Sequence, residues 1–144
     1  MNILKKSGVL LLIMLLSNCN LGDVLTTKDD LTLPEIEEFI GTPLPSEAIN
    51  IHFATSAAID RVVYLRFDLP KDGIPGLLSS LGITAPLGDN FKSLYNIPRL
   101  EWWQPDQVTS YQGTSQIINF MGYDMLVVEL NDDTVTIYLR VTTL

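Results

Sequence analysis

Hydrophobic and polar residues alternate along several stretches of the chain, as they do in strands that bury one face. In residues 61–69 every second side chain is apolar. In residues 48–54 the apolar side is formed by Ile49, Ile51 and Phe53. Only a short connection separates these two segments, so we expect them to pair as an antiparallel hairpin.

The C-terminal third of the chain returns to the same period. It predicts strands over residues 111–120, 125–130 and 135–141. The segment Asn131–Asp133 separates the last two and has the composition of a hairpin loop. These segments bring the expected number of strands to about five.

Two segments have a helical period instead. In residues 71–81 apolar side chains recur at i, i+3, i+4 and i+7, with Asp72 as the expected N-cap and Gly82 just past the end. A second short helix is expected over residues 34–40, followed by Gly41. Because the strands occur in adjacent pairs rather than alternating with helices, we predict an α+β fold. It should contain a mainly antiparallel sheet of about five strands with one or two short helices.

The first residues have the three-part layout of a signal peptide. Lys5 and Lys6 precede an apolar run from Val9 to Leu16, and small and polar residues follow. This run is too short to cross a bilayer core of about 30 Å, which needs about 20 helical residues. We therefore expect export rather than a permanent transmembrane span.

The residues Leu16-Ser17-Asn18-Cys19 resemble the lipobox of bacterial lipoproteins, although that family prefers Gly, Ala or Ser where Asn18 stands. The resemblance implies cleavage before Cys19, a diacylglycerol thioether on its sulfur, and acylation of the new amino group by a fatty acid such as palmitate. It further implies lipid anchoring in the cell envelope, and Asn20 favours the outer membrane of a Gram-negative cell. The alternative is an ordinary secretory signal with an incidental cysteine. Cys19 is the chain's single cysteine, and an unpaired thiol in an exported protein needs a role, which favours lipidation.

These features divide the chain into a signal peptide (1–18), a lipidated N-terminus with a tether (19–32) and one globular α+β domain (33–144). Hydrophobic residues make up 47% of the sequence and charged residues 18%, as in a folded domain. The formal net charge is -8, and two basic residues lie in the segment predicted to be removed. This acidic balance argues against nucleic acid as a partner and against attraction of the domain to anionic lipid by charge.

Few residues are suited to metal or nucleophilic chemistry. The single histidine and single cysteine argue against zinc sites built from these residues and against a Cys-His nucleophile, so we expect neither a metal nor a cofactor. A Ser-His-Asp set could be formed only by His52, with Asp60, Asp68 or Asp124, and no G-x-S-x-G turn exposes a serine. Because His52 lies on the polar side of a predicted strand, we expect a surface histidine.

The stretch PRLEWWQPDQ, residues 98–107, contains two adjacent tryptophans in a proline-rich segment, of which residues 99–103 could form a brief strand. In extended chain Trp102 and Trp103 point to opposite sides, so one can be buried while the other faces solvent. An exposed indole near Arg99, with Glu101 and Gln104 beside it, would suit a sugar ring or a protein hot spot. The large area that a buried aromatic ring contributes favours the other interpretation, in which both tryptophans cover the edge of the core.

The stretches PLPSEA, YLRFDLP, WWQP and VTIYL are similar to landmarks of small exported bacterial proteins, and this resemblance implies no activity and transfers no site residues. We therefore expect a non-enzymatic, lipid-anchored envelope protein with a small binding domain for a protein or a glycan. One alternative is an envelope hydrolase that uses His52 with a carboxylate. Another is an inhibitor or immunity-type protein whose acidic face masks a basic partner.

Overall fold

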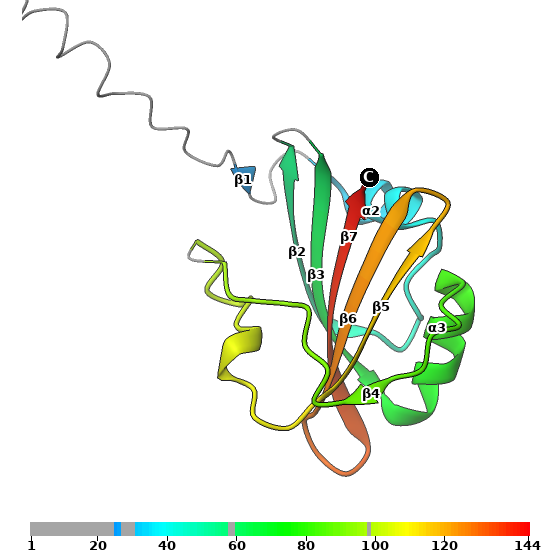
Figure 1. Cartoon of the computed structure of the whole chain (residues 1–144), viewed down its shortest axis with the longest axis vertical. Coiled ribbons are helices and arrows are strands. Elements are labelled where there is room, and N and C mark those ends of the chain that lie inside the picture. The colour runs from blue at the N-terminus through cyan, green and yellow to red at the C-terminus, as the bar shows by residue number, and fades with distance from the viewer. Residues whose placement is uncertain (1–24, 27–30, 58–59, 98) are drawn as a thin grey trace, which may run out of the picture.

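A computed structural model describes residues 25–26, 31–57, 60–97 and 99–144 of the chain. Its strands form a single sheet in the order β1-β2-β3-β7-β6-β5-β4, with every neighbouring pair antiparallel (Figure 1). The strands are β1 Leu25–Thr26, β2 Ile49–Ala57, β3 Arg61–Pro70, β4 Gly88–Asp89, β5 Gln112–Ile118, β6 Met121–Glu129 and β7 Thr134–Thr143.

The predicted α+β class with an antiparallel sheet is confirmed, but the number of strands exceeds the expected five or so. Each of the five predicted segments coincides with a long strand, β2, β3, β5, β6 or β7. The two additional strands, β1 and β4, are two residues long, which is too short to produce a periodic pattern. The brief strand expected over residues 99–103 is wrong. That segment is a series of turns, in which the amides of Leu100 and Trp103 donate to the carbonyls of Ile97 and Leu100.

Two short helices lie where the apolar period predicted them. They are α2, Leu33–Ile40, and α3, Ile74–Leu81, which follows the 3₁₀ turn η1, Lys71–Gly73. Gly41 and Gly82 end them in the left-handed conformation, with φ of 85° and 72°. The expected N-cap Asp72 is wrong, because that residue lies inside η1 and Gly73 occupies the cap position of α3.

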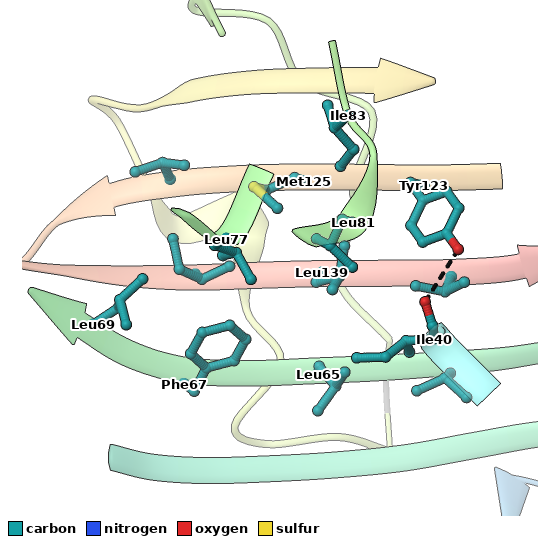
Figure 2. Packing of buried hydrophobic residues seen from close by; sticks show 14 of the residues in the cluster. Ile40, Leu65, Phe67, Leu69, Leu77, Leu81, Ile83, Tyr123, Met125 and Leu139 are labelled. Carbon is teal, nitrogen blue, oxygen red and sulfur yellow. Dashed lines mark hydrogen bonds between the residues drawn. The ribbon is translucent and has the colours of Figure 1, made fainter. Parts of the chain in front are cut away.

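Both helices pack on one face of the sheet, called here the helix face. Its core combines alternate residues of the central strands, such as Leu65, Phe67 and Leu139, with Leu77 of α3 and Ile40 of α2 (Figure 2). Each of these side chains is at most 1% exposed, and full burial of such a side chain stabilises the fold by about 1.5–3 kcal/mol.

A polar contact ties α2 to this core. The hydroxyl of Tyr123, on β6, donates to the carbonyl of Ile40 at 3.1 Å (Figure 2). Burial raises the pKa of the Tyr123 phenol. The last turn of α2 thus gains a partner for a carbonyl that the helix itself leaves unpaired.

A β-bulge in β2 overturns one detail of the predicted pattern. Ile49 pairs with Asp68 and His52 with Arg66, so β2 has one more residue than β3 in this interval. Asn50, with φ of 54°, takes up the extra length. The bulge moves Ile49 to the opposite face from Phe53, and the side chain of Ile49 is 59% exposed.

Candidate functional site

The second face of the sheet is covered by mostly irregular chain, which contains one 3₁₀ turn, η2, Pro105–Gln107, and no α-helix among the described residues. Residues 90–97 and 99–111, called here the covering loop, lie on the opposite side of the sheet from α3 in Figure 1. The face beneath this loop is called the loop face. Its second hydrophobic cluster contains Ala54, Leu94, Leu100, Trp103, Leu126 and Tyr138.

Trp103 is the centre of this cluster and is 1% exposed. Its ring lies edge-to-face against Tyr64 at 5.2 Å and against Tyr138 at 5.4 Å between centroids. Its Nε1 donates to the carbonyl of Tyr95 at 3.0 Å, so the buried indole is fully satisfied. Trp103 therefore joins the covering loop to the two central strands, β3 and β7.

A pair of side chains closes the covering loop on itself. The backbone N–H of Asn96 donates to Oδ2 of Asp106 at 2.8 Å. In return, the backbone N–H of Asp106 donates to Oδ1 of Asn96 at 2.9 Å. Lys92 Nζ lies 3.1 Å from Oδ1 of Asp106. The backbone hydrogen bond from Asn96, followed by the contact with Lys92, lowers the pKa of the Asp106 carboxyl.

The start of the covering loop approaches β5 very closely. A Cβ atom added to Gly113 would lie 2.1 Å from the carbonyl oxygen of Phe91 and 3.2 Å from that of Met125. The short pairing of Gly88 with Gly113 holds this approach. Close backbone contact between Phe91 and Gly113 thus holds this end of the loop on the sheet, and the buried ring of Trp103 holds its centre.

Trp102 has a different environment from its neighbour. It is half-buried, and its ring stacks on His52 with a centroid distance of 5.6 Å and an interplanar angle of 21°. Its edge-to-face contact with Trp103, at 5.9 Å, fixes the indole from the other direction. Trp103 is therefore buried, while Trp102 is partly buried and packs against the same cluster. His52 is exposed, as expected.

Next to this stack lies Arg66, which sequence reasoning did not single out. It is the cross-strand partner of His52 on one side and of Tyr138 on the other, and its guanidinium lies 5.8 Å from the Tyr138 ring centroid. Its Nε atom is buried and has no hydrogen-bond partner among the described residues. We call Trp102, His52 and Arg66 the aromatic patch.

The structure does not assemble the catalytic set considered for His52. Asp68 is buried and accepts hydrogen bonds from Asn50 Nδ2 at 2.7 Å and from Thr136 Oγ1 at 2.6 Å. Asp60 is exposed. Within the described ranges, no hydrogen bond joins His52 to a carboxylate.

Asp124, the third carboxylate considered, is committed to an ion pair across the loop face. Its Oδ2 accepts from Nε of Arg140 at 3.1 Å and from Nη2 at 2.7 Å. The buried carboxylates of Asp68 and Asp124 therefore hold strands together.

The remaining predicted contact residues surround Trp102 in sequence. Arg99 and Glu101 are exposed and Gln104 is partly buried, so the covering loop presents both charges near the half-buried indole. Cys19 lies outside the described residues.

Two hollows in the surface are lined by residues outside the aromatic patch. One, of about 480 Å³, is between residues 42–47 and α3. The other, of about 460 Å³, lies beside Lys71 and Glu129, which pair at 2.8 Å, and beside Asp89, which accepts from Gln112 at 2.8 Å. The charged groups of the second hollow already pair with these neighbours.

In the described part of the chain, no three His, Cys, Asp or Glu side chains cluster closely enough to hold a metal ion. No helix there combines the length and hydropathy needed to span a bilayer. Comparison of the chain with models of protein families, with curated proteins and with solved structures finds no match.

Proposed function

We propose that this chain is a lipid-anchored protein of the bacterial cell envelope whose domain binds a partner through the aromatic patch. The observation that carries the binding part is the division between the two tryptophans. Trp103 holds the covering loop to the sheet, which leaves Trp102 fixed and half-exposed beside His52. A rigid aromatic ring at the surface loses little conformational entropy when it is covered, which suits it to recognition.

The chemistry of the patch indicates the type of contact. An indole supplies a flat apolar surface, and the exposed imidazole beside it supplies hydrogen-bonding nitrogens. The guanidinium of Arg66, which is partly buried, supplies further N–H donors for a hydroxyl, a carbonyl or a carboxylate of the bound molecule. Sugar rings and protein side chains both carry such groups next to apolar surface.

The anchoring part rests on the lipobox-like residues Leu16–Cys19 and on the absence of a second cysteine anywhere in the sequence. Two or three acyl chains on Cys19 would hold the domain stably, because each buried methylene adds about 0.8 kcal/mol and one chain alone binds marginally. A membrane fractionation of Cys19→Ala tests this part. We expect the variant to move from the membrane to the soluble fraction and to lose labelling by palmitate. Unchanged membrane association would contradict the proposal.

A crosslinking pull-down from intact envelopes tests the binding part. Trp102→Ala should lose the captured partner, or the retention of purified cell-wall glycan, by about tenfold, while thermal unfolding changes little. Leu130→Ala is the matched control, since it removes an exposed apolar side chain far from the patch. Equal capture by parent and Trp102→Ala would contradict the site. Binding that survives Trp102→Ala but weakens steeply with salt would instead favour the inhibitor-type alternative.

A further inference from the structure

Exposed apolar side chains concentrate at one end of the sheet. Phe120 is 82% exposed, Ile117 69% and Leu144 65%. Ile118 pairs with Met121, so Phe120 lies in the two-residue turn between β5 and β6, and the amide of Leu144 donates to the Phe120 carbonyl at 2.9 Å. We call Ile117, Phe120 and Leu144 the apolar tip.

Neither burial nor the geometry of the turn explains why a phenylalanine stands at position 120. Asn119 and Phe120 have φ of 49° and 64°, the signs that a type I′ hairpin turn requires at both central positions. The first position has a suitable asparagine, but the second normally takes glycine, because a bulky side chain is disfavoured in the left-handed region. A large apolar side chain therefore stands at a solvent-exposed position where local structure favours its absence.

The strand register places the apolar tip at the end of the sheet where the chain enters. A row of cross-strand neighbours runs from Leu25 of β1 through Ser56, Val62, Thr142 and Gly122 to Ile117 of β5. β1 runs antiparallel to β2, so it begins at the end where β2 finishes. In Figure 1 the arrowheads of β2, β5 and β7 and the C-terminus all lie at this upper end.

Cys19 precedes Leu25 by six residues, which span at most about 20 Å when fully extended. Given the lipid anchor of the proposed function, on which this inference rests, Leu25 is held within that distance of the bilayer, at the same end of the sheet as the apolar tip. The net charge of -8 argues against attraction to anionic headgroups, which leaves apolar contact as the favourable term.

We propose that the apolar tip contacts the membrane surface, with Phe120 inserted at the boundary between headgroups and acyl chains. The contact adds a second, reversible attachment to the covalent one. It fixes the orientation of the domain, with the sheet standing on the membrane and the β6–β7 hairpin at the far end.

The test uses the chain from Cys19 to Leu144 with a maleimide lipid coupled to the Cys19 thiol, on phosphatidylcholine vesicles. Phe120→Trp is compared with Leu130→Trp, which places the same reporter at the exposed hairpin of the opposite end. Lipids brominated near the headgroup should quench the added fluorescence of Phe120→Trp at least twofold more than that of Leu130→Trp. Equal quenching of the two would overturn the proposal.

A second arm keeps the test valid if tryptophan disturbs the turn. With a single-chain lipid on Cys19, which binds vesicles only marginally, Phe120→Gly should weaken partitioning about fivefold while raising thermal stability. Leu130→Gly should leave partitioning unchanged. A Phe120-dependent dimer in sedimentation without vesicles would assign the tip to a second copy of the chain and overturn the membrane assignment. Because the lipid is coupled chemically, these results do not depend on whether cells lipidate Cys19, so failure of the anchor and failure of the tip contact are distinguished.

Discussion

The two faces of the sheet are covered in different ways. On the helix face, α2 and α3 place apolar side chains against a continuous aliphatic core. On the loop face, an irregular segment depends on one buried indole, one reciprocal side-chain pair and one close backbone approach. Both buried carboxylates, Asp68 and Asp124, belong to the loop face.

This difference bears on where function can reside. A helix satisfies its own backbone hydrogen bonds and needs only an apolar stripe to dock. A loop must be held by specific side chains, and it can present others in fixed positions without adapting to a periodic pattern. The helix face is thus suited to stability, and the loop face to holding Trp102 and His52 at the surface.

The largest expected effect is on the anchor of the loop face. Trp103→Ala should lower the free energy of unfolding by about 3–5 kcal/mol, because it removes a fully buried indole and leaves a cavity. Urea unfolding followed by circular dichroism measures this, with the half-buried Trp102→Ala as a control of smaller effect. A loss below about 1 kcal/mol for Trp103→Ala would mean that the loop face contributes little to the core.

Substitution of a glycine by alanine should change the stability in opposite directions on the two faces. Gly113→Ala should destabilise by about 1–3 kcal/mol, because its Cβ would meet the Phe91 carbonyl oxygen at 2.1 Å. Gly76→Ala, in α3, meets nothing within 4 Å and should stabilise by about 0.5–1 kcal/mol. Thermal melts of the two variants test the pair. A neutral Gly113→Ala would show that the start of the covering loop moves away from β5 without cost.

Sequence periodicity predicts the helix face well. The alternation in β3 and β7 and the helical spacing in residues 74–81 follow directly from which side chains must be buried. The bulge at Asn50 escapes such reasoning, because a single extra residue is defined only by its partner strand. The short strands β1 and β4 escape it because two residues have no period.

The loop face is predicted only in part. The adjacent tryptophans left two interpretations open, one exposed ring or two rings on the edge of the core, and the structure buries Trp103 and partly buries Trp102 against the same cluster. The stack of Trp102 on His52 and the position of Arg66 depend on how the covering loop returns to the sheet. No local pattern encodes that return, since the loop has neither a helical nor a strand period.

The smallest expected effect compares two exposed carboxylates that support the two faces. On the helix face, Glu35 accepts from the amide and the hydroxyl of Thr32 at the start of α2, at 2.6 and 2.7 Å. On the loop face, Asp106 accepts from the Asn96 amide. The pKa of the Glu35 carboxyl lies below its ordinary value of 4.5, and that of Asp106 below 3.8. In each case a hydrogen bond from a backbone N–H is the main cause.

Because each carboxyl has a lower pKa when folded, its contribution to stability is complete above the unfolded pKa and is lost as the pH falls through the folded one. We therefore expect stability to decline as the pH is lowered below about 4.5. Carboxyl chemical shifts should titrate with midpoints below the ordinary values for both groups. Glu35→Ala and Asp106→Ala should each reduce the acid dependence of the unfolding midpoint. Loss of the dependence in only one variant would show that one face alone carries the acid sensitivity. Both groups are exposed, and they differ in the structure they hold and in the pairing of Asp106 with Lys92.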